Sequence, residues 1–320
     1  MNSRKQIFAL VLTAILTAHL WAMTASAEER PSPEREMTAV QAVILGVVEG
    51  LTEYLPVSST GHLLLAEKIM KIGENPSYTA EEQQRAKAAA DAYTICIQAG
   101  AIIAVLGLYF RRVLQMLNGL AGRDPLGRRL LINVITGFIP AAVIGLFCNG
   151  IIKEYLFGTW PVVIAWLVGG IAIIMVSMKN RGNAARPALA LDDLSWKMAL
   201  LIGFAQCIAM WPGTSRSLVT IVGGVLAGLS LSAAVEFSFL LGVVTLCAAT
   251  GYDGLKHWQI MAQTFDAQSM AIGVFFAFVA AVVSVKWMVT YLNRHGLAIF
   301  GYYRVALALV VSVLLYSKII

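Results

Sequence analysis

Six long apolar segments dominate this 320-residue chain and restrict the folds that are open to it. About 20 apolar residues in an α-helix span the roughly 30 Å hydrocarbon core of a bilayer. The chain is 58% hydrophobic and only 13% charged, whereas about a quarter of the residues in soluble domains are charged. We therefore expect an all-α polytopic membrane protein with six transmembrane helices, at Tyr93–Phe110, Leu131–Ile151, Val162–Met178, Phe237–Gly251, Met270–Tyr291 and Leu297–Tyr316.

Two further apolar regions, Val40–Met70 and Leu200–Leu231, are interrupted by polar residues and turn formers. In the first region about nine residues, or roughly 14 Å of helix, precede Glu49, which is half the thickness of the hydrocarbon core. Irregular backbone at that depth is tolerated only where protein or water surrounds it. We expect each region to form a re-entrant helical hairpin with a polar tip.

The distribution of basic residues supports this topology. If the chain starts outside and Val40–Met70 returns to the outside, the basic loops 111–129 and 179–197 both fall on the cytoplasmic side, where Lys and Arg accumulate. A full crossing by Val40–Met70 would put both loops outside. The same rule accounts for the formal net charge of +6, so this charge gives no reason to expect a nucleic-acid partner.

The two interrupted regions resemble each other at one offset of 157 residues (203 − 46 = 206 − 49 = 215 − 58). The matching positions are Gly46, Glu49 and Ser58 in the first region and Gly203, Gln206 and Ser215 in the second. Each region is followed by three expected spans, so the two units would have opposite orientations. We expect an inverted-topology repeat, with halves at about 38–178 and 198–317 and a binding site between them.

The amino terminus resembles a secretory signal peptide. Arg4 and Lys5 precede an apolar run from Ile7 to Met23, and an Ala-Ser-Ala sequence ends at Ala27, as expected before a cleavage site. The apolar run is also long enough for an uncleaved signal anchor. We assign residues 1–27 to a signal peptide and residues 28–320 to a single membrane-embedded domain.

The second polar tip has the sequence Trp-Pro-Gly-Thr-Ser-Arg-Ser at positions 211–217. Proline and glycine end a helix, and the hydroxyls that follow can cap the next helix. A helix start offers free N–H groups and positive dipole, so together with Arg216 it suits a phosphate. The expected phosphate-binding residues at this tip are Gly213, Thr214, Ser215, Arg216 and Ser217.

The first polar tip combines two carboxylates with hydroxyls and an imidazole. Glu49 and Glu53 lie four residues apart, so they share one helix face and repel each other unless a cation or proton intervenes. A proline turn with hydroxyl caps explains Ser58 or Ser59 but leaves the glutamates and His62 unexplained. His62 can reach a serine hydroxyl. A serine nucleophile with His62 as its base is therefore possible at this tip.

Other metal and redox chemistry is not indicated. The four cysteines lie inside apolar segments without CxxC spacing, which excludes a disulfide framework or zinc site of the usual kind. Of the four histidines, only His62 lies within a polar cluster.

Together the two tips resemble those of the undecaprenyl-diphosphatases, the bacitracin-resistance type of membrane phosphatase. The resemblance extends from about Thr38 to Tyr316 and rests on the E-x-x-x-E run with the following P-V-S-S-T-G-H, and on the P-G-x-S-R-S sequence. It implies removal of the outer phosphate from undecaprenyl pyrophosphate, which recycles the lipid carrier for cell-wall polymers at the outer face of the bacterial cytoplasmic membrane. The amino-terminal extension and Leu218 depart from the family pattern. Carried over by motif position, the functional residues would be Glu49, Glu53, Ser59, Thr60, His62, Ser215 and Arg216.

The physical interpretation of the tips suggests a mechanism. Phosphoryl transfer depends mostly on positioning and charge neutralisation, so Arg216 would hold the diphosphate. Glu49 and Glu53 would ligate a divalent cation, Mg²⁺ or Ca²⁺, that bridges to the substrate. Ser59 would be the nucleophile and His62 its general base, although a metal-activated water is an equal alternative. Ser58 and Thr60 complete the expected substrate contacts.

Two other functions fit the same features. A transporter or flippase for a pyrophosphate-linked lipid would use re-entrant hairpins in inverted repeats, and an ion pore would use mid-membrane carboxylates for selectivity. Apart from the lipid substrate and the surrounding membrane lipids, the sequence leaves homo-oligomer formation open. For the remaining intramembrane charges, Glu236, Lys286 and Arg304, structural pairing among themselves is favoured over contact with the substrate.

Overall fold

The computed structural model describes residues 37–72, 78–156, 158–182 and 188–318. Within these ranges it contains six helices that are long and apolar enough to cross a membrane, which confirms the predicted number. They are α4 (Ala80–Leu108), α6 (Pro125–Leu156), α7 (Thr159–Gly182), α10 (Leu231–Thr264), α11 (Ala267–His295) and α12 (Ala298–Tyr316). The predicted signal peptide, residues 1–27, lies outside the described residues.

Several of these helices are longer than the apolar segments that predicted them. Helix α4 begins 13 residues before Tyr93 (93 − 80), because residues 80–92 are rich in Ala, Glu, Gln and Lys, which favour helix without being apolar. Its start is fixed by Thr79, whose hydroxyl accepts from the Glu82 N–H while the Glu82 side chain bonds back to Thr79. An additional helix, α5 (Phe110–Leu120), follows α4 directly.

The two interrupted regions each form a pair of short helices joined by a turn. The first pair is α2 (Ala39–Thr52) and α3 (Ser59–Met70), and the second is α8 (Trp196–Cys207) with a 3-10 turn, η2 (Ile208–Met210), and α9 (Arg216–Leu226). The helices α2, α3, α8 and α9 have 14, 12, 12 and 11 residues, too few for a span. We call the connecting residues 53–58 the first elbow and residues 208–215 the second elbow.

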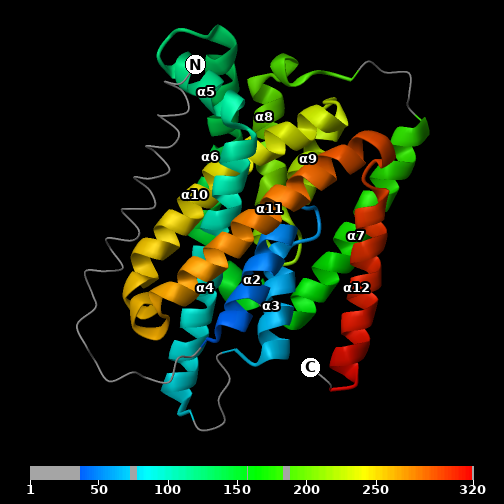
Figure 1. The fold of residues 1–320 in the computed structure, drawn as a ribbon. Helices are drawn as coiled ribbons and strands as arrows, with labels where there is room; N and C mark the ends of the chain where they lie inside the picture. The colour runs from blue at the N-terminus through cyan, green and yellow to red at the C-terminus, as the bar shows by residue number, and fades with distance from the viewer. Residues whose placement is uncertain (1–36, 73–77, 157, 183–187, 319–320) are drawn as a thin grey trace.

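The short helices pack against the long ones (Figure 1). Helix α2 packs so closely against α11 that a Cβ added at Gly46 would collide with the backbone oxygen of Gly273. Helix α8 packs in the same way on α6, where Gly203 faces the backbone of Gly137. Small residues at such crossings allow close backbone approach between membrane helices. Helices α7 and α12 form a separate pair along one side of the molecule (Figure 1), and the elbows lie between these groups.

Candidate active site

The two elbows, which lie about 160 residues apart in the chain, touch each other. The Ser217 hydroxyl donates to the Leu55 carbonyl at 2.9 Å, and the Ser215 hydroxyl lies 3.5 Å from the same oxygen. Leu55 belongs to the first elbow, Ser215 ends the second elbow and Ser217 lies in the first turn of α9, so the polar tips predicted from the sequence meet in the interior of the protein.

Both elbows end on a serine with the same unusual backbone conformation. Ser58 has φ 74° and ψ 101°, and Ser215 has φ 76° and ψ 115°. Positive φ is rare for residues other than glycine and costs on the order of 1–3 kcal/mol, and it tends to persist at functional sites where the surroundings enforce it. Each serine immediately precedes a helix, so the strain sets the direction in which α3 and α9 present their first residues.

Glu53 lies at the centre of the contact between the elbows. Its carboxylate accepts a hydrogen bond from the Ser59 hydroxyl at the start of α3. The other carboxylate oxygen, Oε1, lies 3.4 Å from Nη2 of Arg216, the first residue of α9. Ser59 and Arg216 thus both lie within hydrogen-bond distance of Glu53, and Glu53 and Ser59 are buried.

The Arg216 guanidinium is held in place from several sides. Its Nη1 donates to the Ser238 carbonyl at 3.1 Å, and its central carbon lies 5.4 Å from the centre of the Tyr54 ring. It also occupies the space where a Cβ at Gly242 would lie, so residue 242 has to be glycine for this placement. The buried Nε of Arg216 has no hydrogen-bond partner in the described part of the chain. This N–H is therefore a donor that the described protein groups leave unused.

Glu49 is completely buried one helical turn before Glu53, and both of its carboxylate oxygens lack a hydrogen-bond partner among the described residues. A buried carboxylate with two unpartnered oxygens is unfavourable unless a cation or a proton neutralises it. No group of three or more His, Cys, Asp or Glu residues surrounds a common point within the described residues. The site thus offers hard oxygen ligands for Mg²⁺ or Ca²⁺, with hydroxyls and ligand oxygens needed to complete the shell.

The position of His62 differs from the expected serine–imidazole pair. Its Nδ1 lies 2.6 Å from the Ser58 carbonyl, and its Nε2 lies 2.7 Å from the Tyr303 hydroxyl. A carbonyl can only accept, so Nδ1 carries the proton and Nε2 accepts from Tyr303. The imidazole also stacks on the Tyr303 ring, with centroids 5.8 Å apart and planes at 7°. The hydrogen bond expected between Ser59 and His62 is replaced by the one from Ser59 to Glu53.

Arg304 on α12 joins the two elbows, a role that the sequence did not reveal. The side chain is fully buried and donates to the Gly213 carbonyl at 2.8 Å and to the Pro56 carbonyl at 3.5 Å. It donates further to the carbonyls of Ala165 at 2.8 Å and Trp166 at 3.4 Å on α7. One guanidinium therefore fixes both turns against α7.

The other intramembrane charges do not pair among themselves, which corrects the expectation for Glu236, Lys286 and Arg304. Glu236 instead accepts from Nε of Arg112 at 2.8 Å, and this hydrogen bond raises the pKa of the Arg112 guanidinium. From the sequence, Arg112 is expected only as part of the basic cytoplasmic loop 111–129, because the hydropathy pattern does not predict α5. Lys286 is exposed.

The other residues predicted to bind substrate lie in or next to the two elbows. Ser58 and Thr214 are buried, and Gly213 adopts φ 92° in the second elbow, a conformation that favours glycine. Thr60 is exposed on α3.

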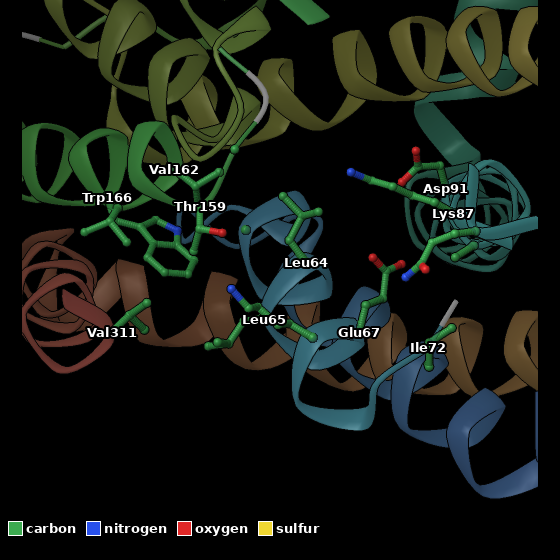
Figure 2. Close-up of a pocket in the computed structure, with 16 residues that line it drawn as sticks. Leu64, Leu65, Glu67, Ile72, Lys87, Asp91, Thr159, Val162, Trp166 and Val311 are labelled. Atoms are coloured by element: carbon green, nitrogen blue, oxygen red, sulfur yellow. The ribbon is translucent and has the colours of Figure 1, made fainter. Parts of the chain in front are cut away.

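A cavity of about 410 Å³ lies beside α3, one residue from His62, and is bounded by Gly61 and Trp166. Leu64 and Val162 contribute to its apolar wall (Figure 2). On the opposite side Glu67 points towards α4 (Figure 2). A cavity of this size falls in the range of small-molecule sites.

A scan against family models matches residues 42–310 of the chain to the model described as bacitracin resistance protein BacA. The chain therefore belongs to the BacA family. Three curated relatives carry the name undecaprenyl-diphosphatase. The one from Nitrosomonas europaea is 39% identical over 88% of this chain and 96% of its own. The one from Rhodopseudomonas palustris is 43% identical over 83% of this chain and 93% of its own. The one from Ectopseudomonas mendocina is 42% identical over 85% of this chain and 92% of its own. BacA membership agrees with the multi-pass helical architecture, and the resemblance stated from the two polar tips is confirmed.

Proposed function

We propose that this protein hydrolyses undecaprenyl diphosphate to undecaprenyl phosphate and inorganic phosphate. The observation that carries the proposal is the cluster of Glu53, Ser59 and Arg216, which come from two distant elbows and share one buried point. Membership of the BacA family and the names of the relatives supply the substrate. A cation, a carboxylate and a hydroxyl at one point are the groups that phosphoryl transfer needs.

Arg216 binds the terminal phosphate in this proposal. Its Nε has no partner in the described part of the chain, and its long 3.4 Å contact with Glu53 can be exchanged for phosphate oxygens, which a guanidinium binds in pairs. Ser215 and Ser217 lie beside it at the start of α9, where the N–H groups of the helix also favour an anion. The charge that develops on the phosphoryl oxygens is neutralised there.

Ser59 is the proposed nucleophile. Its oxygen attacks the terminal phosphorus, the bond to the bridging oxygen breaks, and undecaprenyl phosphate leaves. The Ser59 proton passes to Glu53, which already accepts its hydrogen bond; this contact supports Glu53 over His62 as the first proton acceptor. Water then hydrolyses the phosphoserine. Direct attack by water, positioned by the same carboxylate, is the alternative.

Glu49 and Glu53 are the residues that would hold a divalent cation, Mg²⁺ or Ca²⁺. The unpartnered oxygens of Glu49 support this assignment. When bound, the cation would neutralise charge on the diphosphate. Without it, the two carboxylates would repel the substrate that Arg216 attracts.

We infer that the elbows are the tips of two re-entrant hairpins in an inverted repeat. The contacts support this arrangement, because α2 packs on α11 of the second half while α8 packs on α6 of the first. The matched conformations of Ser58 and Ser215 add support (215 − 58 = 157). With the basic loops in the cytoplasm, the site opens to the outer face of the cytoplasmic membrane, where the product would re-enter cell-wall polymer synthesis.

Release of phosphate by the purified protein in detergent tests the proposal. Undecaprenyl diphosphate with Mg²⁺ or Ca²⁺ and no ion gradient should yield inorganic phosphate. Glu53→Gln should lower the rate by about 100-fold or more, since it removes the acceptor for Ser59, whereas Glu81→Gln, at an exposed position of α4, should not change it. Tight binding of intact substrate without phosphate release would favour the transporter instead.

Ser59→Ala tests the nucleophile separately. Loss of turnover together with loss of phosphate-labelled protein would support the phosphoserine. Ser312→Ala is the control, since Ser312 bonds only the Ala308 carbonyl of its own helix in the described structure. Substantial turnover by Ser59→Ala would move the assignment to water.

A further inference from the structure

A cleft of about 400 Å³ lies where the first turns of α6 and α8 meet, and no step of the proposed reaction uses it. Arg128 and Arg129 of α6 and Trp196 of α8 line it. Lys197 extends the basic surface, with its Nζ 5.8 Å from the centre of the Trp196 ring. Helix α8 lies at the opposite end of the molecule from the start of α4 (Figure 1).

The acidic groups near this cleft are engaged elsewhere. Asp124 accepts the Gly127 N–H at 2.9 Å, Asp192 pairs with Arg112 at 3.4 Å, and Asp193 accepts the Ala190 N–H at 3.2 Å. In the described ranges none of Arg128, Arg129 and Lys197 forms an ion pair, and Arg129 Nη2 donates to the backbone carbonyl of Asp193 at 3.3 Å. The three side chains therefore present positive charge at the cleft that no carboxylate contacts directly.

Exposed apolar side chains lead away from the cleft along both helices. On α6 and α8 they recur every three or four residues, so each set forms one face of its helix. The two helices are adjacent, because Gly203 of α8 packs directly on Gly137 of α6. The side chains are Ile132, Ile135, Ile139, Val143 and Leu146 on α6, Leu201 and Phe204 on α8, and Ile208 directly after α8, each between 42% and 72% exposed.

We propose that this cleft binds an anionic phospholipid of the surrounding membrane. The headgroup phosphate would lie between Arg128 and Arg129, with Trp196 at the level of the headgroups, where this residue concentrates. The two acyl chains would lie along the apolar faces of α6 and α8. Basic pockets between membrane helices recognise anionic lipid headgroups in this way.

The site is distinct from the catalytic centre. Helix α8 has 12 residues, which places the cleft about 18 Å from the second elbow along its axis. The proposal needs only that the protein is embedded in a membrane, so it does not depend on the phosphatase activity. A polyprenyl phosphate has the same head chemistry but one long chain, and two apolar faces fit a two-chain lipid better.

Native mass spectrometry of the detergent-solubilised protein with phosphatidylglycerol tests the site. We expect the wild type to retain phosphatidylglycerol in preference to phosphatidylcholine. Arg128→Gln and Arg129→Gln should each weaken binding about fivefold, as expected for one basic residue at a lipid surface. Arg123→Gln, an exposed residue outside the cleft lining, should bind as the wild type does.

Three results would overturn the proposal. The first is equal retention of phosphatidylglycerol by wild type and both single variants. The second is equal retention of phosphatidylcholine. The third is a larger loss of undecaprenyl phosphate than of phosphatidylglycerol from Arg128→Gln and Arg129→Gln, which would make the cleft a site for the polyprenyl lipid. Trp196→Ala provides a second, uncharged variant; it should weaken binding without changing the melting temperature in lipid-free detergent.

Discussion

Replacement of Arg304 by leucine should lower turnover strongly while changing the free energy of unfolding only slightly. The guanidinium makes two short hydrogen bonds, both at 2.8 Å, to the carbonyls of Gly213 and Ala165. Hydrogen bonds from a charged donor contribute about 1.5–3 kcal/mol each, so their loss costs roughly 3–6 kcal/mol. The substitution also removes a charge that is buried without a carboxylate partner, and this relieves a desolvation penalty of several kcal/mol.

The two effects on stability largely cancel, but the effect on geometry does not. We expect Arg304→Leu to lower the free energy of unfolding by about 2 kcal/mol or less. Both elbows lose their common anchor, and a displacement of about 1 Å at a reacting group can lower turnover roughly 100-fold. Arg304→Lys should be less stable than Arg304→Leu, because one buried ammonium keeps the desolvation penalty and cannot reach all four carbonyls.

Phosphate release from undecaprenyl diphosphate and thermal unfolding, both in the same detergent, measure the two quantities. Arg294→Leu is the control, since Arg294 is exposed in the last turn of α11. If Arg304→Leu kept more than a tenth of the wild-type turnover while folded, the anchoring role would be refuted. If Arg304→Lys were the more stable variant, the desolvation argument would fail.

Three further predictions concern the site. Gly242→Ala should raise the apparent KM for undecaprenyl diphosphate about tenfold or more in steady-state assays, because its Cβ takes the space of the Arg216 guanidinium; an unchanged KM would mean that Arg216 does not bind substrate from this position. Tyr303→Phe keeps the stack on His62 but removes the hydroxyl that holds its imidazole. We expect kcat to fall several-fold with little change in KM. Tyr302→Phe, at the exposed neighbouring position, should change neither constant. Chelation should abolish phosphate release, and Glu49→Gln should raise the cation concentration for half-maximal rate by about tenfold or more; the same cation requirement in wild type and variant would place the metal elsewhere.

The arrangement of the short helices was predictable because local signals determine it. Pro56, Pro212 and Gly213 end helices in otherwise apolar sequence, and the polar tips follow them directly. The convergence of Glu53 with Arg216 was also predictable, since a diphosphate site requires cationic and catalytic groups at one point.

The partners of the remaining polar groups were not predictable. Arg304 bonds backbone carbonyls, which every sequence offers, so no pattern in the side chains could identify them. His62 bonds a tyrosine 241 residues away, and a tyrosine in an apolar helix is ordinary. Glu236 pairs with Arg112 because α5 turns the basic loop back towards the helix bundle, and α5 is amphipathic and too short to stand out in a hydropathy profile.

The proposed repeat explains how one scaffold can bring opposite charges together. At the offset of 157 residues Pro56 corresponds to Gly213, and Arg304 bonds the carbonyls of both. Ser59 corresponds to Arg216 (59 + 157 = 216), and each is the first residue of its helix. The backbones at these positions are therefore alike while the side chains differ: the carboxylates and Ser59 lie in and beside the first elbow, and the Arg216 cation lies beside the second. In the proposed mechanism the first set alone would repel a diphosphate, and the second alone would bind it without an acceptor for the proton of Ser59. The proposed reaction therefore needs both halves.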